Sequence, residues 1–319
     1  MRVLTVVGNR PQFVKSGPLA LALAAAGIAE TVLHTGQHWD RELSAVFFEE
    51  LALPEPGHRL DLRTADVEAM RGAVLEVVRS EAPDAVLVLG DTNSTLAGAL
   101  AAAQADIPAG HVEAGMRSFD RSMPEELNRV LTDHASTLLL CSTETAMRNL
   151  DREHVTGEAH LVGDVMADVS LAFRDIAEER SRVLQELGLE PGSYLVVTAH
   201  RAGNVDDPGR LGRLVALLEA LPAPVVFPMH PRTATRLAAA GLTGRLAGTQ
   251  VVPPLGYLDF LKLLRHSRAL LTDSGGAQKE AYLLGVPCVT LRDSTEWVET
   301  VEAGWNTLVD LDPDAARAA

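Results

Sequence analysis

The chain has 319 residues, enough for two domains of about 150 residues each, and 47% of its residues are hydrophobic, which allows sizeable cores. Its net charge of −15 and its aromatic content of 4% argue against a general nucleic-acid surface, which would carry a basic stripe and aromatic side chains that stack on bases. A small anionic ligand is still compatible with this charge, because a local cationic site can oppose the charge of the whole chain.

The two cysteines, Cys141 and Cys288, lie far apart in the sequence, and neither has a CxxC or a Cys/His neighbour. A disulfide framework or a metal site is therefore not expected. The first apolar run is followed at once by polar residues and lacks the cleavage pattern of a signal peptide. No apolar stretch reaches about 18 residues without a charge, Gly or Pro. We therefore expect a soluble, cytoplasmic protein with no membrane partner.

Short runs of β-branched residues or Leu alternate with longer segments of Ala, Leu, Glu and Arg. The runs are almost continuously apolar, as expected for parallel strands that are buried on both faces. Helical patterns separate them, for example at 16–27, 94–104 and 209–222. This alternation predicts an α/β protein of βαβ units with right-handed crossovers. The predicted strands are 2–8, 31–36, 85–90, 108–114, 137–142, 159–163, 194–200, 224–230, 250–254, 268–275, 288–292 and 306–310.

The alternation pauses at 164–188, where the sequence predicts one long amphipathic helix, and a new series of strands begins at Tyr194. We therefore place a domain boundary near Val165. The prediction is an N-terminal domain at 1–165 and a C-terminal domain at 166–319, both Rossmann-like with parallel sheets, facing each other across a cleft.

Ionisable and small polar residues are concentrated where the predicted strands end. In open α/β sheets, ligands bind outside the carboxyl ends of the strands, so these residues are the strongest indication of function that the sequence offers by itself. The residues at these ends are Arg10, Lys15, Gln37, His38, Asp91, His111 and Glu113 in the first half, and His200, Arg201, His230, Arg232, Ser274, Gly275, Gly276 and Arg292 in the second.

Three carboxylates have both a functional and a structural interpretation. Glu113 ends an apolar strand, where a buried carboxylate is costly unless it has a partner or a role, so function is favoured. Asp91 precedes a polar stretch and could simply cap a helix. Glu125 and Ser122 fit a capping box, yet Glu125 also shares a helix face with Arg129, four residues later.

The cationic residues have structural interpretations as well. Arg10 stands before Pro11 and could simply start a helix, with Lys15 on its solvated face. His200 could be a core histidine. His230 stands before a proline, and its two interpretations are evenly balanced.

The stretch "DSGGAQKEA" combines a strand end, a glycine pair and the start of a helix. Backbone N–H groups at Gly275 and Gly276 could approach an anion at the helix N-terminus, and Glu280 could accept from a sugar diol. The structural interpretation is a cap by Ser274 followed by a left-handed glycine turn. There is no GxxxxGK[ST] motif, and "GNRPQF" lacks the GxGxxG spacing, so neither a P-loop nor a nicotinamide fold is supported.

Taken together, ten motifs resemble the non-hydrolysing UDP-N-acetylglucosamine 2-epimerases. They follow the family order from residue 8 to about residue 310 and are specific only jointly. The resemblance implies the GT-B architecture, with two Rossmann-like domains around a nucleotide-sugar cleft, no redox cofactor and a homodimer. The motifs are "GNRPQFVK", "TGQH", "GDTNST", "HVEAGMRS", "PEELNR", "TAHR", "MHPR", "YLDF", "DSGGAQKE" and "LRDSTE".

The resemblance also implies a role for each matching residue. The acid/base candidates are Asp91, Glu113 and Glu125, which would surround the hexose together with Lys15 and Arg129, and which of the three carboxylates removes the proton stays open. The residues that would hold the diphosphate are Arg10, Ser274, Gly275, Gly276 and His200, and His200 is also counted with the catalytic residues. Glu280 would bind the ribose and Phe260 would contact the uracil. Arg292 and His230 would bind the substrate near its phosphates.

The family's chemistry explains why such a set is needed. The C2 proton of the sugar is not next to a carbonyl group, so its direct removal is very unfavourable. The family instead eliminates UDP to give a 2-acetamidoglucal and adds UDP back with the proton delivered to the opposite face. This needs carboxylates on both faces of the ring, and donors that stabilise the departing UDP.

The sequence departs from the family pattern at three places, and each departure leads to an expectation. Gly203 stands where the family motif has a Glu that in bacterial members helps bind a second, activating substrate molecule, so we expect no need for substrate activation. Trp297 and Val298 replace a common Arg-Pro pair, which indicates an atypical branch. The family continues past "NTLVD" with further helices, and "DPDAARAA" has the pattern of the start of one.

Three alternatives to this function stay open, and a fourth, a non-catalytic nucleotide-sugar sensor, is disfavoured because all the acid/base positions are present. One is an epimerase of a related sugar, such as a UDP-2,3-diacetamido uronic acid. The second is the hydrolysing relative, which tends to carry Arg after the "GD" where this chain has Thr92. The third is a GT-B glycosyltransferase, against which the three carboxylates argue, because a transferase needs at most one base.

Overall fold

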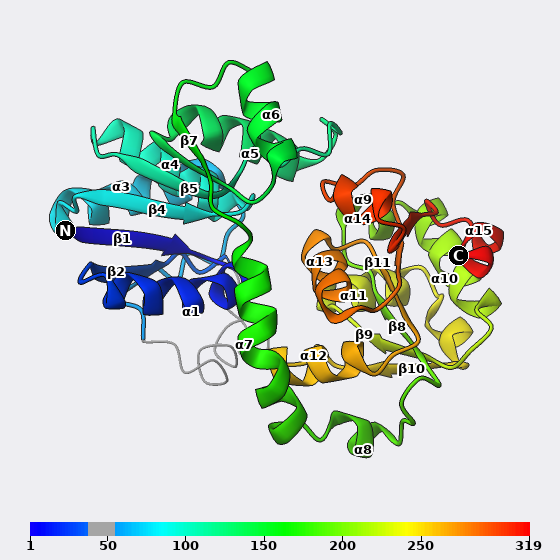
Figure 1. The fold of residues 1–319 in the computed structure, drawn as a ribbon. Helices are drawn as coiled ribbons and strands as arrows, with labels where there is room; N and C mark the ends of the chain where they lie inside the picture. The colour runs from blue at the N-terminus through cyan, green and yellow to red at the C-terminus, as the bar shows by residue number, and fades with distance from the viewer. Residues whose placement is uncertain (38–54) are drawn as a thin grey trace. The chain divides into compact units, whose positions relative to one another are not determined.

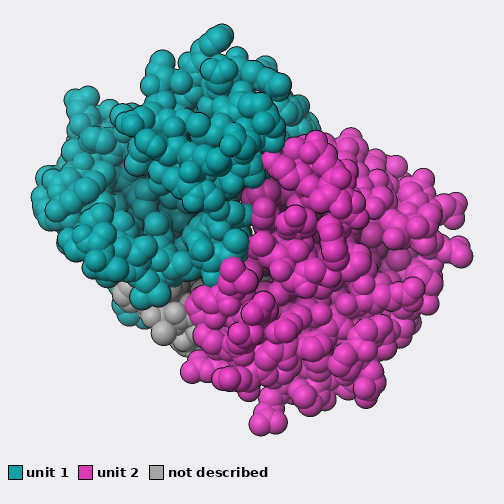
Figure 2. Space-filling model, viewed as in Figure 1, with its two compact units in different colours: residues 1–169 teal, residues 170–319 magenta. Residues whose placement is uncertain are grey.

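The computed structural model describes residues 1–37 and 55–319, and the chain divides into two compact units, residues 1–169 and 170–319 (Figure 2). Each unit contains one parallel sheet with helices packed against it (Figure 1). Two Rossmann-like sheets in one chain are the components of the GT-B architecture, and the predicted α/β class is confirmed. The predicted boundary near Val165 falls on the first residue of a helix.

The sheet of unit 1 has seven described strands in the order β3-β2-β1-β4-β5-β6-β7, all paired in parallel. The chain winds first to one side of β1 and then to the other, so the carboxyl ends of β1 and β4 form the switch point at which such sheets bind ligands. The elements are β1 (Arg2–Val7), α1 (Arg10–Ala25), β2 (Ala29–His34), β3 (His58–Arg59), α3 (Val67–Glu81), β4 (Ala85–Leu89), α4 (Asn93–Gln104), β5 (Ala109–Ala114), α5 (Pro124–Ala135), β6 (Leu138–Cys141), α6 (Glu144–Arg152), β7 (Glu158–Leu161) and α7 (Val165–Arg180), which runs into unit 2.

The sheet of unit 2 has six strands in the order β10-β9-β8-β11-β12-β13, also parallel. Its switch point lies between β8 and β11. The elements are α8 (Val183–Leu187), β8 (Leu195–Thr198), α9 (Ala202–Val205), α10 (Pro208–Ala220), β9 (Val225–Pro228), α11 (Pro231–Ala239), the 3₁₀ helix η2 (Thr243–Leu246), β10 (Thr249–Val252), α12 (Tyr257–Arg265), β11 (Ala269–Thr272), α13 (Gly275–Leu284), β12 (Cys288–Thr290), α14 (Val298–Glu302), β13 (Asn306–Leu308) and α15 (Pro313–Ala318).

The central strands are buried because helices cover both faces of each sheet. Five of the six residues of β1 are buried in sequence, which accounts for its continuously apolar pattern. In unit 1 the strand side chains pack with those of α3 and α4 into one core cluster. In unit 2 the two faces of the sheet carry separate clusters, one against α10 and one against α12 and α13.

The single helix predicted at 164–188 is wrong, because the structure divides this segment into α7 and α8. The side chain of Lys262 donates to the backbone carbonyls of Glu178 (2.8 Å) and Ser181 (2.9 Å). The N–H of Val183 donates to the Ser181 hydroxyl instead of to a helix carbonyl (3.3 Å). Tertiary and side-chain partners therefore take the backbone groups that a continuous helix would pair internally.

The helix predicted at the end of the chain is present as α15. The strand β3, which has only two residues, has no counterpart among the predicted strands because it carries no apolar run. Both cysteines are buried free thiols, and burial raises the pKa of each to about 12. None of the helices that the structure describes combines the length and the apolar character needed to cross a bilayer.

Candidate functional site

The carboxyl ends of β4 and β5 bring together four of the predicted residues. Glu113, in β5, forms an ion pair with Lys15 of α1. Asp91, directly after β4, forms an ion pair with Arg129 of α5. Asp91 also acts electrostatically on both Lys15 and Glu113, so the two pairs lie close to each other. Unit 1 thus presents two carboxylates, each with its own cation, at its switch point.

The backbone at Glu113 is unusual for a residue with a side chain. Its φ is +68°, in the left-handed region that favours glycine, and the register between β5 and β6 shifts between Val112 and Ala114. Such a bulge redirects a side chain at a strand end. The result is a carboxylate whose Oε2 meets Lys15 and whose buried Oε1 has no hydrogen-bond partner among the described residues.

Burial raises the pKa of the Glu113 carboxyl, and the nearby Lys15 ammonium opposes this shift without cancelling it. The negative charges of Asp164 and Asp91 raise the pKa further. A carboxyl whose pKa is raised holds a proton more readily, which suits a group that transfers protons. Asp164 was not among the predicted site residues. It follows β7, so extending the strand-end rule to that strand would have identified it.

The structural interpretation of Asp91 as a helix cap is wrong. The N-cap of α4 is Thr92, which forms a capping box with Thr95. This leaves the Asp91 carboxylate to Arg129, while its backbone carbonyl accepts from the amide of Asn128 (3.0 Å).

The capping box predicted for Ser122 and Glu125 is also wrong. The N-cap of α5 is Met123, which makes no side-chain cap, and the Ser122 hydroxyl donates to Asp120 (2.6 Å). Glu125 lies partly buried in the first turn of α5, one turn before Arg129. The shared helix face is therefore present, and from this face Arg129 also forms an ion pair with Asp91.

In unit 2, a buried carboxylate connects the ends of β8 and β11. Asp273, directly after β11, accepts from the backbone N–H groups of His200 (3.1 Å) and Arg201 (3.0 Å) and from the amide of Asn204 (3.1 Å). The Nδ1 atom of His200 lies 3.5 Å from the same carboxylate. Asp273 therefore fixes the loop that carries His200 beside the turn that begins with Ser274. The core interpretation of His200 is wrong, since 40% of its side chain is exposed.

The turn "DSGG" starts α13 directly. Ser274 is the N-cap, and its hydroxyl accepts from the N–H of Ala277 (3.4 Å). Gly275 and Gly276 are not among the glycines with positive φ, so the left-handed glycine turn is wrong. Glycine is needed at 275 for space, because an added Cβ would lie 2.0 Å from Oε1 of Glu296. A Cβ at 276 would meet its nearest atom only at 3.9 Å, so this backbone stays approachable at the helix N-terminus.

Two arginines flank the buried carboxylate of Glu296. A guanidinium nitrogen of Arg292 lies 3.0 Å from Oε2, and one of Arg201 lies 3.7 Å from Oε1. Arg292 was predicted as a site residue and is brought beside α13 by this arrangement. Arg201 was named only among the residues at strand ends, without a role, and Glu296 was not named, although it belongs to the motif "LRDSTE".

The remaining predicted residues have separate environments. His230 caps α11, where its Nδ1 accepts from the N–H of Arg232 (3.1 Å), and its ring stacks on that of His200 at 5.5 Å. Glu280 is buried on α13. Phe260 is 3% exposed within the core cluster of unit 2 that packs against α12 and α13, so contact with a uracil stays a prediction.

The side chains of two predicted residues lie outside the described part of the chain. Arg10 begins α1, as its structural interpretation requires, but its side chain lies outside the described part of the chain. His38 lies outside the described residues altogether. Its neighbour Gln37 accepts from the Ser94 hydroxyl at the start of α4 (2.8 Å).

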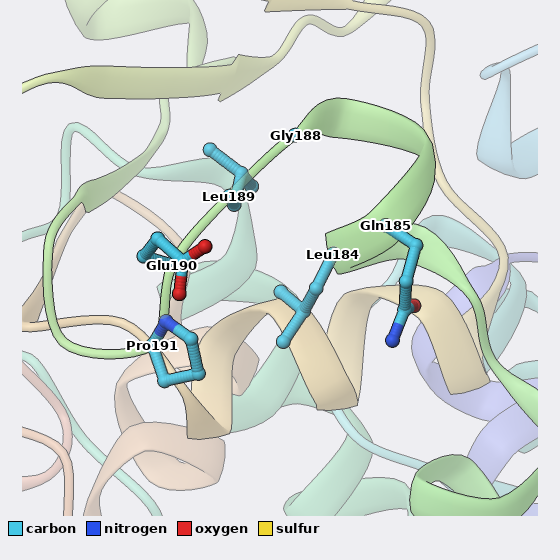
Figure 3. A pocket seen from close by; sticks show the side chains of 6 residues that line it. All are labelled: Leu184, Gln185, Gly188, Leu189, Glu190 and Pro191. Atoms are coloured by element: carbon cyan, nitrogen blue, oxygen red, sulfur yellow. The ribbon is translucent and has the colours of Figure 1, made fainter.

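Unit 2 also has a surface hollow of about 350 Å³ beside α8 (Figure 3). Its only ionisable lining side chain is that of Glu190, and none of the predicted site residues lines it. Within residues 1–37 and 55–319, no group of three His, Cys, Asp or Glu side chains is arranged to hold a metal ion. The lining residues are Leu184, Gln185, Gly188, Leu189, Glu190 and Pro191.

Comparison with known proteins gives consistent matches along the chain. The family model of UDP-N-acetylglucosamine 2-epimerase matches residues 22–319. A UDP-2,3-diacetamido-2,3-dideoxy-D-glucuronate 2-epimerase of Pseudomonas aeruginosa is 44% identical over 335 residues, which cover 100% of this chain and 92% of that protein. A UDP-N-acetylglucosamine 2-epimerase of Methanocaldococcus jannaschii is 42% identical over 323 residues, which cover 97% of this chain and 88% of that protein.

A solved structure extends this likeness to three dimensions. The crystal structure of the Methanocaldococcus jannaschii UDP-GlcNAc 2-epimerase in complex with UDP-GlcNAc and UDP matches with a TM-score of 0.94 at 41% identity. The match covers 100% of this chain and 91% of that one.

Proposed function

The chain belongs to the UDP-N-acetylglucosamine 2-epimerase family, and we propose that it interconverts UDP-GlcNAc and UDP-ManNAc without net hydrolysis. The substrate is inferred from the relatives, one of which was crystallised with UDP-GlcNAc and UDP. The observation that carries the proposal is the pair of carboxylate–cation contacts, Glu113 with Lys15 and Asp91 with Arg129, at the switch point of unit 1.

The proposed reaction has two halves. A carboxylate removes the C2 proton, the electrons of the C2–H bond form the C1=C2 double bond, and the bond between C1 and the UDP oxygen breaks. The product of this half is a 2-acetamidoglucal and UDP. In the second half the UDP oxygen attacks C1 again, and a carboxyl group on the other face of the ring delivers a proton to C2.

In this scheme Asp91, Glu113 and Glu125 are the acid/base candidates. The raised pKa of Glu113 supports its use in proton transfer, because burial makes this carboxyl hold a proton more readily than an exposed glutamate does. Lys15 and Arg129 hold the carboxylates and offer positive charge to the sugar. The partly buried Glu125 is one helical turn from Arg129 and completes the set.

Unit 2 would hold UDP during the lifetime of the glycal. The open N-terminus of α13 at Ser274, Gly275 and Gly276 supplies backbone N–H groups for an anion. We place His200 and Arg292, together with Arg10, on the diphosphate, and Glu280 on the ribose. His230 joins His200 by ring stacking, and Phe260 is proposed near the uracil.

The decisive experiment is incubation with UDP-GlcNAc in D₂O, followed by NMR of the products. Deuterium at C2 of an intact UDP-sugar supports the epimerase. Free ManNAc with UDP would instead identify a hydrolysing enzyme. Absence of exchange, with turnover only after an acceptor is added, would identify a glycosyltransferase and contradict the proposal.

A second candidate substrate is a UDP-2,3-diacetamido uronic acid. The relative from Pseudomonas aeruginosa, a UDP-2,3-diacetamido-2,3-dideoxy-D-glucuronate 2-epimerase, favours it at 44% identity. The two candidates differ by a carboxylate at C6 and a second acetamido group. A comparison of kcat/KM for the two UDP-sugars decides between them, and we expect UDP-GlcNAc to have the higher value.

We further propose a cytoplasmic homodimer, on the basis of the family alone. Light scattering after size exclusion then gives about twice the chain mass of 34.1 kDa. A mass of one chain at micromolar concentration would contradict this.

A further inference from the structure

His111 lies in β5, two residues before Glu113, and is fully buried. Its Nδ1 is 2.7 Å from a carboxylate oxygen of Asp133, and its Nε2 is 2.7 Å from the backbone carbonyl of Gly90. A carbonyl and an ionised carboxylate can only accept hydrogen bonds. Both ring nitrogens must therefore donate, which only the doubly protonated imidazolium can do.

The ionised form of Asp133 is supported independently of His111, because the Arg117 guanidinium and the N–H of Gly115 both contact its carboxylate. Burial alone would raise its pKa, but His111 and Arg117 outweigh burial and hold the pKa below its usual value. The Arg117 guanidinium lies 2.7 Å from Oδ2. A protonated Asp133 that donates to a neutral His111 is therefore disfavoured.

The backbone N–H and the backbone carbonyl of Gly90 both form hydrogen bonds with β5. Its N–H donates to the carbonyl of Val112 (3.0 Å), and its carbonyl accepts from His111. Its φ of +70° makes the chain turn sharply just before Asp91. A Cβ at this position would lie 3.5 Å from Oε2 of Glu113, so the turn is directly beside that carboxylate.

Asp133 also contacts the turn that follows Glu113. Its other oxygen accepts from the N–H of Gly115 (3.2 Å), two residues after Glu113. One buried pair, His111 with Asp133, thus contacts the turn that carries Asp91 and the turn that follows Glu113.

We propose that His111 is a positioning residue for the reaction. As an imidazolium that bridges Asp133 and Gly90, it fixes the Gly90 turn and so sets where Asp91 lies relative to Glu113. It touches neither the sugar nor the reacting atoms. This inference rests on the proposed function in one respect, the use of Asp91 and Glu113 in proton transfer.

Two variants separate the two hydrogen bonds of His111. The amide nitrogen of His111→Asn takes the place of Nδ1, so it can still donate to Asp133 but no longer to Gly90. The amide nitrogen of His111→Gln takes the place of Nε2, so it can still donate to Gly90 but no longer to Asp133. Because His111→Gln gives up the bond to the charged Asp133 carboxylate and His111→Asn only the bond to a neutral carbonyl, we expect His111→Gln to be the less stable of the two in urea unfolding.

The activities of the two variants differ if His111 positions Asp91. We expect kcat for C2 exchange to fall about tenfold or more in His111→Asn but by about threefold or less in His111→Gln, with the Kd for UDP unchanged in both. Equal activity in the two variants, or losses of kcat that simply follow their losses of stability, would overturn the proposal.

The charge state of His111 can be tested independently of activity. In ¹⁵N NMR of histidine-labelled protein at pH 7.5, we expect both ring nitrogens of His111 to carry protons, with the His111→Gln variant assigning the signals. A neutral ring would overturn the proposal. If His111 is an imidazolium but wild-type protein leaves the C2 proton of UDP-GlcNAc unexchanged, the proposed function fails while the bridging geometry stands.

Discussion

The ammonium of Lys15 and the carboxylate of Glu113 form an ion pair in which the two side chains are only 10% and 8% exposed. Burial removes both charges from water, and their contact with each other compensates for part of that loss. The two charges are therefore tolerated only as a pair, and either charge left alone is costly.

The first prediction concerns the removal of one charge or of both. We expect Lys15→Met to destabilise the chain by about 3–5 kcal/mol, because it leaves a buried carboxylate without its cation. The double variant Lys15→Met with Glu113→Gln should be more stable than Lys15→Met, since no unpaired buried charge remains. Urea unfolding at pH 7 measures both values. A double variant that is less stable than Lys15→Met would contradict this account.

The second prediction uses the two glycines of α13 as a matched pair. Gly275→Ala must displace the Glu296 carboxylate from between Arg201 and Arg292, so we expect a lower Tm and weaker binding of UDP. Gly276→Ala adds the same methyl group to open space. We expect it to keep the wild-type Tm and still weaken UDP binding, because the methyl group lies where the diphosphate would approach.

Calorimetric titration with UDP and thermal unfolding give the two readouts for each glycine variant. Wild-type affinity for UDP in Gly276→Ala would show that the diphosphate binds elsewhere. If larger side chains at these positions release free UDP and glycal during turnover, this turn is also what retains UDP after the C–O bond breaks.

Local pattern was sufficient to predict most strands and the polar residues that follow them. The run at β1 is apolar because both faces are covered, and Lys15, Asp91 and Glu113 follow from the rule that ligands meet strand ends. The partners could not be predicted in this way. Lys15 pairs with a residue 98 positions away, a distance over which periodicity carries no information.

Contacts between elements explain what the sequence could not show. The sequence correctly places Glu125 and Arg129 on one helix face, but it does not show that the fold brings Asp91 to Arg129 from 38 positions away. The predicted single helix at 164–188 is wrong because Lys262 of α12 binds two of its carbonyls. There a contact between elements overrides a helical preference that is correct locally.

The third prediction concerns stability in acid. His34 ends β2, 2% exposed, with its ring stacked on Phe13 at 5.0 Å and its Nδ1 accepting from the N–H of Gly36 (2.9 Å). Burial, assisted by the charge of Arg59, lowers its pKa from 6.5 to about 4. The unfolded chain therefore binds a proton below pH 6.5 that the folded chain does not bind until about pH 4.

The contribution of His34 to the free energy of unfolding is therefore fully present above pH 6.5. It is lost as the pH falls from 6.5 through 4, by about 3 kcal/mol in total. In His34→Asn, the side-chain oxygen can still accept from Gly36 but does not titrate. We expect the variant to lose correspondingly less stability between pH 7 and pH 4 in urea unfolding. An identical pH dependence in both proteins would mean that the pKa of His34 in the folded state is close to its ordinary value and would contradict this account.

The last prediction concerns substrate activation. Gly203 lies exposed on α9, where an added Cβ would meet nothing within 4 Å, so the fold does not require glycine there. The resemblance implies that bacterial members carry a Glu here that helps bind a second, activating substrate molecule, so its absence predicts that the rate depends hyperbolically on UDP-GlcNAc. The reverse reaction, from UDP-ManNAc, should likewise start without added UDP-GlcNAc. A sigmoidal rate curve, or a reverse reaction that stays silent until UDP-GlcNAc is present, would contradict this.

Gly203→Glu tests the same point from the other direction, with Gly203→Gln as a control of equal size and no charge. Because the site is open, both variants should keep the wild-type Tm. We expect Gly203→Glu to remain hyperbolic as well, because one carboxylate supplies only part of the contacts that a second nucleotide sugar needs. If Gly203→Glu alone becomes sigmoidal while Gly203→Gln does not, the rest of an activating site is already present in this chain.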